Sequence, residues 1–308
     1  MTVCIAAICE GGTRIIGASD RMLTAEDMIE FEPPQTKIWA LTSSIIVMAS
    51  ADTCVLTEIL KNVELEVKAR ISSEPEQWWR VRDIAELYSR RYQEFHFTRA
   101  ENVILKPLGL NRESFINAQR TMDPKFVHSV GRKLADFKLP GVSAIFVGID
   151  NDGPQLRSEH HLLYPHIYSA NGSELTCQDT IAFAAIGVGA WHAESQFMSA
   201  RHTRQCNFPE TLLLTYSAKK CAEVAPGVGK WTDMFSIGPG LGASTYIEPH
   251  LVNGLERIYQ RTRKEMERVN KRAEKKAKRY IEEITRSPKQ GQQTAKGKLR
   301  RPLSSCAD

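Results

Sequence analysis

Four residues in the first part of the chain, Thr2, Asp20, Lys37 and Ala51, carry groups that could together hydrolyse an amide bond. A threonine hydroxyl is a poor nucleophile until a base takes its proton. The α-amine of an N-terminal threonine can be that base, because its unperturbed pKa is roughly 7.7–8.0. The Lys37 ammonium would lower this pKa, and the Asp20 carboxylate would keep the lysine charged and oriented. A main-chain N–H near Ala51 would stabilise the tetrahedral oxyanion.

This chemistry needs a free amine at Thr2, so Met1 has to be removed. A small residue at position 2 permits ordinary methionine removal, and we expect that no further propeptide is needed. No basic leader precedes the apolar run from Val3 to Cys9, and no stretch approaches the roughly 18 apolar residues of a membrane helix. We therefore expect a protein that is neither exported nor inserted into a membrane, and that uses no metal or cofactor.

A predicted hairpin places Asp20 beside Thr2. The run Thr2–Cys9 and the run Arg14–Asp20 are separated by Glu10-Gly11-Gly12, which is typical of a tight turn. If the two runs pair antiparallel, the last residue of the second strand returns to the first residue of the first strand. The carboxylate and the hydroxyl should then meet at one end of a sheet.

A second predicted hairpin repeats this arrangement for Lys37. The strand KIWAL begins at Lys37, the turn lies at Ser43-Ser44, and the returning strand ends at Ala49-Ser50-Ala51. Lys37 and Ala51 should therefore also lie at neighbouring strand ends. Taken singly, each residue has a plainer interpretation, since Thr2 could simply follow a methionine and Lys37 could be a solvated charge at a strand end.

The composition is that of a folded protein with reduced thiols. Apolar residues make up 42% of the 308 residues and charged residues 25%, which is average for a globular chain. The cysteines are odd in number, scattered and without a CxxC pair: Cys4, Cys9, Cys54, Cys177, Cys206, Cys221 and Cys306. This pattern argues against a disulfide scaffold, and we expect a cytoplasmic protein.

The order of apolar segments predicts an α+β fold. Most strand-like runs are apolar at consecutive positions, as in strands that are covered on both faces. Two sheets packed face to face, each covered by helices, would bury them all in a four-layer αββα sandwich. The predicted later strands are Val142–Ile149, with a turn at Asp150–Pro154, the AFAAIG segment and the DMFSIG segment. The predicted helices are Asp52–Lys68, Gln77–Phe97, Ala190–His202 and Pro209–Val224.

The charge distribution separates the end of the chain from the rest. Residues 254–308 contain 17 Lys and Arg against 7 Asp and Glu, a net charge of +10, whereas residues 1–253 have a net charge of −5. We predict one domain over 1–253 with an irregular, partly helical insertion at about 98–141. A basic helix over 254–287 and a disordered tail over 288–308 should follow.

The stretches TVCIAAICEGG, GASDRM, TKIWAL and VMASAD resemble the N-terminal nucleophile (Ntn) hydrolases of the proteasome type, and the later segment AIGVGAWHAES is similar to the glycine turn of that family. The resemblance is closest to proteasome β subunits and bacterial HslV-like ring proteases, and covers about residues 2–245. It implies that Thr2 is the nucleophile, that Asp20 and Lys37 are its charged partners, and that the amide of Ala51 belongs to the oxyanion hole. It also implies a homo-oligomeric ring, a peptide or protein substrate, and an unfolding partner.

The chain departs from this family at three positions. Val188 lies within the glycine turn, where the family usually has a serine, and Ala51 replaces a usual glycine. Pro226 stands where a serine usually precedes a later glycine pair, and proline supplies neither a hydroxyl nor an amide proton. A catalytically weak or inactive assembly subunit that binds partners through its basic C-terminal extension is therefore the alternative, and a small-molecule amidase is a third hypothesis.

Two other features have plainer interpretations. His160, His161 and His166 could bind a metal, but they lie in a strand-like run without a pattern of carboxylates. The basic helix over 255–286 has a narrow, Ala-rich apolar seam, which favours packing against a partner subunit over binding of nucleic acid.

Overall fold

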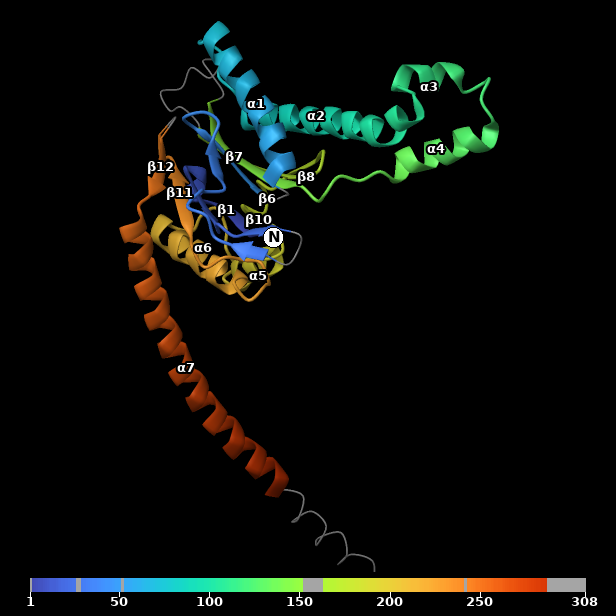
Figure 1. Ribbon diagram of the computed structural model, residues 1–308. Helices are drawn as coiled ribbons and strands as arrows, with labels where there is room; N and C mark the ends of the chain where they lie inside the picture. The colour runs from blue at the N-terminus through green and yellow to red at the C-terminus, as the bar shows by residue number, and fades with distance from the viewer. Residues whose placement is uncertain (1, 26–28, 51–52, 152–162, 241–242, 287–308) are drawn as a thin grey trace, which may run out of the picture. The chain divides into compact units, whose positions relative to one another are not determined.

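The computed structural model describes residues 2–25, 29–50, 53–151, 163–240 and 243–286. These residues form an α+β fold with two five-stranded antiparallel sheets, a two-stranded hairpin and seven α-helices (Figure 1). The strands are β1 (Cys4–Cys9), β2 (Arg14–Ser19), β3 (Leu23–Ala25), β4 (Ile29–Phe31), β5 (Ile38–Ala40), β6 (Ile45–Ser50), β7 (Ser143–Asn151), β8 (Leu163–Asn171), β9 (Glu174–Cys177), β10 (Phe183–Ile186), β11 (Asp233–Ile237) and β12 (Ser244–Ile247). The helices are α1 (Thr53–Ser73), α2 (Val81–Ala100), α3 (Arg112–Ala118), α4 (Pro124–Asp136), α5 (Ala190–Ser199), α6 (Phe208–Ala222) and α7 (Pro249–Arg286).

The first sheet, of order β10-β1-β2-β11-β12, is built on the N-terminal hairpin. β1 pairs with β2 from Cys4 opposite Ser19 to Cys9 opposite Arg14. A short 3-10 turn at Glu10–Gly12 joins them, so the predicted hairpin and its turn are confirmed. The β-ladder begins at Cys4 rather than at Thr2.

The second sheet has the order β5-β6-β7-β8-β9. β5 pairs with β6 from Ile38 opposite Met48, which confirms the second hairpin over its described residues. The turn predicted from Asp150 onward is wrong for its first two residues, because β7 continues to Asn151, which pairs with Leu163 of β8. Asp150 instead links β7 to α2, since its Oδ1 accepts a hydrogen bond of 3.0 Å from the amide of Val81 at the start of that helix. The rest of that predicted turn lies outside the described residues.

The inner strands are apolar at consecutive positions because both of their faces are buried. In β1, Cys4, Ala6 and Ile8 pack in a cluster to which both sheets contribute, while Ile5 and Ala7 pack against α5 and α6. Side chains alternate along a strand, so each face of β1 supplies a different core. This is the burial pattern that the sequence predicts for the strand.

Helices cover the outer faces of the two sheets. A cluster of buried side chains joins β6 and β7 to α1 and α2, with Val47 and Phe146 from the strands and Ile59 and Tyr88 from the helices. A separate cluster joins β1 and β10 to α5 and α6. Figure 1 shows α1 and α2 on one side of the strands and α5 and α6 on the other.

The predicted elements differ from the structure mainly at their ends. Helix α1 continues to Ser73, beyond the predicted end at Lys68, and α2 begins at Val81 rather than at Gln77. The strands β3, β4, β9 and β12 were not predicted, because each has only three or four residues and is too short to show a periodicity. Their pairing depends on neighbours that the tertiary fold supplies.

The predicted insertion at 98–141 forms a helical arm. It runs from the end of α2 through a π-helical turn at Glu101–Leu105 to α3 and α4, each of which begins with a side-chain cap, from Asn111 and Asp123 respectively. The arm has a small core of its own around Leu105, Phe115 and Val130.

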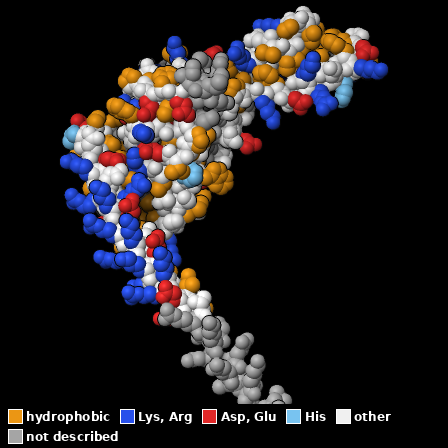
Figure 2. Space-filling view, turned by 60° about the horizontal axis from the view of Figure 1, so that its bottom comes forward, with side chains coloured by type: hydrophobic (Ala, Val, Ile, Leu, Met, Phe, Trp, Pro, Cys, Tyr) orange, Lys and Arg blue, Asp and Glu red, His pale blue; other side chains and the backbone are white. Residues whose placement is uncertain are grey.

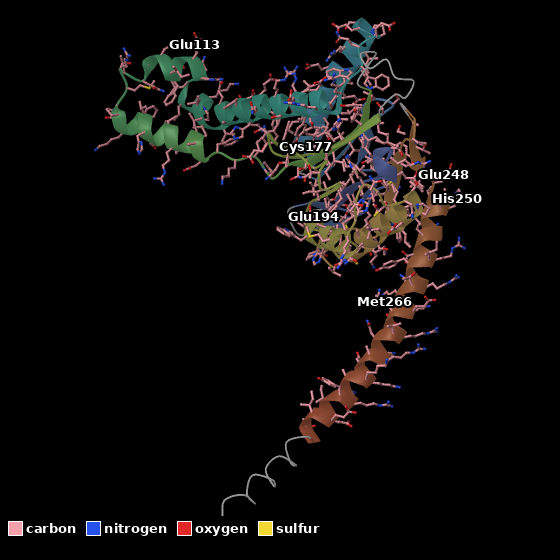
Figure 3. All side chains as sticks on the ribbon, turned by 180° about the vertical axis from the view of Figure 1, so that it is seen from behind. Glu113, Cys177, Glu194, Glu248, His250 and Met266 are labelled. Atoms are coloured by element: carbon pink, nitrogen blue, oxygen red, sulfur yellow. The ribbon has the colours of Figure 1, made fainter. Side chains whose placement is uncertain are left out.

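The chain divides into two compact units, Met1–Leu255 and Glu256–Asp308. Helix α7 begins at Pro249, so the boundary predicted at residue 254 falls inside a continuous helix. In the second unit Met266, labelled in Figure 3, is 59% exposed, and Figure 2 shows a row of Lys and Arg side chains along the visible face of the helix. Residues 288–308 lie outside the described ranges. No described α-helix combines the length and the apolar character needed to cross a bilayer.

Candidate active site

The two hairpins bring Thr2, Asp20 and Lys37 together at neighbouring strand ends. Asp20 directly follows β2, and its amide donates a hydrogen bond of 3.2 Å to the carbonyl oxygen of Val3. Lys37 directly precedes β5 in the other sheet. The site therefore lies where the ends of the two sheets meet, and all three side chains are almost fully buried, with exposed fractions of 1%, 0% and 7%.

The three side chains contact one another directly. The Thr2 hydroxyl donates a hydrogen bond to Oδ1 of Asp20, and the Lys37 ammonium donates one to the Thr2 hydroxyl oxygen. Lys37 also donates to Oδ1 of Asp20 over 3.0 Å and to the carbonyl oxygen of Met22. All three ammonium protons have an acceptor, and an alkoxide formed on Thr2 would face a positive charge.

Main-chain amides from three separate segments hold the Asp20 carboxylate. Its Oδ1 accepts from the amide of Val3 over 3.0 Å, and its Oδ2 accepts from the amides of Met22 over 3.1 Å and Gly229 over 2.8 Å. Burying a carboxylate is costly unless hydrogen bonds replace its water. These three amides and the Lys37 ammonium supply that replacement and fix the carboxylate beside Thr2.

A glycine turn after β10 holds the main chain of Thr2. Gly187 has a φ of +91°, and a Cβ atom built on it would lie 2.2 Å from the carbonyl oxygen of Thr2. The amide of Gly189 donates to the same oxygen over 3.3 Å. The turn therefore needs a glycine at position 187 and anchors Thr2. Val188 between them is 44% exposed and brings no hydroxyl to the site.

A cavity of about 530 Å³ opens beside the three residues. Thr2 and Lys37 line it together with mostly apolar side chains, among them Met22, Trp39 and Leu56. Such walls favour a neutral, apolar group next to the hydroxyl. Three larger hollows, of about 1010, 1000 and 830 Å³, are more open to solvent and include none of the three site residues. We take the cavity of about 530 Å³ as the candidate substrate pocket, because Thr2 and Lys37 line it.

Cys4 lies next to the site but is not a competing nucleophile. Burial raises the pKa of its thiol to about 12, an effect that the Lys37 ammonium opposes and the Asp20 carboxylate reinforces. The thiolate is the reactive form of cysteine, so this thiol is inert near neutral pH. Its Sγ lies 3.8 Å from the carbonyl oxygen of Ala49, which it faces as a weak donor.

Helix α6 and the loop that follows it contribute two residues, Lys219 and Gly229, that were not predicted as site residues. Gly229 gives its amide to Asp20, and the Lys219 ammonium binds the loop from inside the protein. Pro226, which cannot donate, is exposed, and the amide that reaches Asp20 comes three residues later. Lys219 had only a weak signal, as the first of two lysines near a helix C-terminus, where cations commonly sit.

The remaining predicted site residues are placed as follows. Ala51 lies outside the described residues, as do His160 and His161. His166 is on β8, where its Nδ1 lies 2.7 Å from Oδ2 of Asp179. Burial tends to raise the pKa of Asp179, but the bonds from His166 and from the amide of Ile167 outweigh it and lower that pKa. Among the described residues, no three His, Cys, Asp or Glu side chains are grouped so that they could hold a metal ion.

The chain matches no protein-family model and no curated protein.

Proposed function

We propose that this protein is a threonine-type amide or peptide bond hydrolase whose nucleophile is Thr2, exposed as the N-terminal residue after removal of Met1. The observation that carries the proposal is the hydroxyl of Thr2, which is hydrogen-bonded to both the Asp20 carboxylate and the Lys37 ammonium at one end of an apolar cavity. A buried hydroxyl needs one partner, whereas a carboxylate, an ammonium and a hydroxyl in mutual contact are typical of an activated nucleophile.

The reaction follows from these groups. Oγ1 of Thr2 attacks the carbonyl carbon of the substrate while its proton passes to the α-amine of the same residue. The Lys37 ammonium stabilises the charge that develops on Oγ1 and holds the amine neutral. The α-ammonium then gives the proton to the leaving amine, and an ester to Thr2 remains. Water, activated by the α-amine, attacks this ester and releases the acid, which restores the hydroxyl.

The proposal extends to the architecture and the assembly. The two sheets, the shared apolar cluster between them and the helix pairs on their outer faces support a four-layer αββα sandwich of the Ntn hydrolase type. In the proteasome-like family this sandwich assembles into homo-oligomeric rings, and we extend that assembly, and a cytoplasmic location, to this chain. The apolar walls of the cavity favour cleavage after an uncharged apolar residue.

A catalytically silent assembly subunit is the second candidate. It is favoured by Val188, which puts an exposed isopropyl group where the family usually has a serine hydroxyl. It is also favoured by Pro226, which replaces a second serine that the family often has. In that case the contacts of Asp20 would serve stability alone, and Thr2 would not react.

Intact mass measured before and after exposure to a β-lactone that acylates N-terminal threonine separates the two candidates. We expect a chain without Met1 that gains one adduct, and no adduct on Thr2→Ala. Thr13→Ala is the matched control, because the Thr13 hydroxyl only closes the first hairpin turn through Glu10, 2.9 Å away. A protein that lacks Met1 and stays unlabelled, or one that retains Met1, would contradict the proposal and favour the silent subunit.

The rates of hydrolysis of short peptides and of simple amides then distinguish a peptidase from a small-molecule amidase. We expect peptides with an apolar residue before the cleaved bond to be turned over faster, because that side chain fills the cavity. Faster turnover of simple amides would favour the small-molecule amidase.

A further inference from the structure

Lys219 is a lysine with an exposed fraction of 0%, near the C-terminal end of α6. Burying an ammonium is costly unless its protons are bonded and its charge is paired. Lys219 meets both conditions through Oε1 of Glu223 over 2.6 Å, the carbonyl oxygen of Gly229 over 2.8 Å and the carbonyl oxygen of Lys230 over 2.9 Å. Its three protons thus have three acceptors, two of them in one loop.

The two carbonyl bonds fix the orientation of Gly229. Its carbonyl oxygen points to Lys219, and its amide points to Oδ2 of Asp20. The residue is therefore held from both sides, by a cation on one side and by the carboxylate of the candidate site on the other. A peptide segment that is bonded at both ends cannot rotate without breaking one of these contacts.

Glu32 lies on the other side of the loop and leaves no space for a side chain at Gly229. A Cβ atom built on Gly229 would lie 1.9 Å from Oε1 of Glu32, and the same oxygen accepts a bond of 3.0 Å from the amide of Trp231. Hydrogen bonds to Glu32 and to Lys219 thus hold the loop. Any loss of the Lys219 bonds would be passed to Asp20, because no other described bond holds the carbonyl oxygens of Gly229 and Lys230.

An apolar side chain at position 219 would fill the same space at a lower desolvation cost, since replacing buried ions by apolar groups is often neutral or stabilising. Such a side chain could not hold two carbonyl oxygens. Burial lowers the pKa of Lys219, and the bond to Glu223 opposes that effect. The Glu223 carboxylate thus favours the charged lysine, which all three bonds require.

We propose that Lys219 is a positioning residue for the reaction at Thr2, acting through Gly229 to hold the carboxylate of Asp20. The inference rests on the proposed function for its kinetic consequence, while its structural consequence can be measured without any activity. Lys219 does not touch the substrate. It sets the position of the group that orients the nucleophile.

Lys219→Met should slow acylation of Thr2 without weakening binding of the β-lactone. We expect the maximal rate of labelling to fall about 100-fold, as a displacement of about 1 Å can cause, while the half-saturating concentration stays within about twofold. Lys220→Met is the matched control, because it removes a cation one residue away that bonds the same Glu223 over 2.8 Å. We expect it to change the labelling rate by less than about threefold.

Hydrogen exchange at the Gly229 amide gives the second readout. In Lys219→Met this amide should lose protection at least about tenfold, while the amides of β11 that pair with β2 keep theirs. Equal loss at both would mean a general destabilisation and would overturn the inference. If Lys219→Met does not fold, Lys219→Gln carries the same comparison.

The outcomes keep the two proposals apart. A wild-type protein that is not labelled at Thr2 refutes the proposed function, and the exchange experiment still decides whether Lys219 holds Gly229. A wild type that is labelled, with Lys219→Met labelled at the same rate, refutes the positioning role alone.

Discussion

The hydroxyl of Thr2 donates a hydrogen bond to the carboxylate of Asp20, 18 residues further along the chain. The same carboxylate oxygen accepts from the Lys37 ammonium, so a single atom joins the Thr2 hydroxyl to the Lys37 ammonium. Because that oxygen is fully buried, its loss should be costly to stability as well as to reaction.

Asp20→Asn tests this cost. The NH2 group of asparagine cannot accept a hydrogen bond, so either the donors to Oδ1, which include Val3, or the donors to Oδ2, Met22 and Gly229, would lose their acceptor. Lys37 would also lose its buried counter-ion. We expect the free energy of unfolding to fall by about 3–5 kcal/mol, as when one partner of a buried ion pair is removed. Urea unfolding measures the change.

Asp233→Asn provides the comparison for that measurement. Asp233 pairs with Arg21 over 2.5 Å, and their side chains are 14% and 19% exposed, so water can replace part of the lost interaction. The loss should therefore be smaller. Equal losses in the two variants would contradict the special position of Asp20.

Gly187→Ala tests the turn that anchors Thr2. A methyl group there would meet the carbonyl oxygen of Thr2, and the φ of +91° disfavours any side chain. We expect a loss of stability of about 1–3 kcal/mol and slower labelling of Thr2. Gly131→Ala is the control, since nothing lies within 4 Å of the added methyl in α4, and it should gain about 0.5–1 kcal/mol. Equal effects of the two substitutions would argue against a constrained turn.

The buried thiol of Cys4 predicts a loss of stability at alkaline pH. The folded chain retains this proton up to about pH 12, whereas the unfolded chain releases it near pH 9. Above pH 9 the unfolded state binds fewer protons, so the free energy of unfolding falls as the pH rises, by at most about 1.4 kcal/mol per unit from this group. Below pH 9 the stabilising contribution is fully present.

Urea unfolding over a range of roughly two pH units around the release of a free thiol, about pH 8.5 to 10.5, isolates the effect. Cys4→Ala should show a shallower decline than the wild type, because the other titrating groups are the same in both proteins. Identical slopes would show that Cys4 ionises in the folded protein as it does in the unfolded chain.

The basic helix α7 gives a prediction about assembly. The part of α7 that belongs to the second unit exposes an apolar seam that includes Ile258, Met266 and Val269. Both sheets and the candidate site belong to the first unit, Met1–Leu255. A chain that ends at Leu255 should therefore keep its stability and its labelling at Thr2, but lose oligomer mass in light scattering. This loss should not depend on salt. Binding of nucleic acid that weakens steeply with salt and vanishes on truncation would instead assign the helix to nucleic acid.

The part of the site that could be predicted is the part made by local hairpins. The turn at Gly11-Gly12 sets the register of β1 with β2, and register alone brings Asp20 back to Thr2. The same reasoning placed Lys37 at the start of β5. In each case a short turn determines which residues of the two strands lie opposite each other. The position of the strand-end residues can therefore be predicted from the local sequence.

The remaining contacts depend on packing between distant segments. Gly229 reaches Asp20 across 209 residues of chain, and its position is set by Lys219 and Glu32 rather than by its neighbours. The β7 strand likewise passes through Asp150 and Asn151 because β8 pairs with them, against their local preference for a turn. Neither outcome follows from composition or periodicity, since both are decided by partners that only the folded chain supplies.

Three main-chain amides donate hydrogen bonds to the Asp20 carboxylate. Because these bonds would stabilise the fold with or without a reaction, the presence of this aspartate in a related chain would be a poor indicator of activity. A lineage that no longer needed the reaction could discard the Thr2 hydroxyl, yet it would still have to retain a carboxylate that ties together the N-terminal strand, the residues after β2 and the loop after α6. Selection for folding alone would preserve the aspartate. Retention of threonine at position 2 would be the better indicator of the proposed reaction, because among the described residues its hydroxyl bonds only Asp20 and Lys37, whereas the carboxylate joins three segments of the chain.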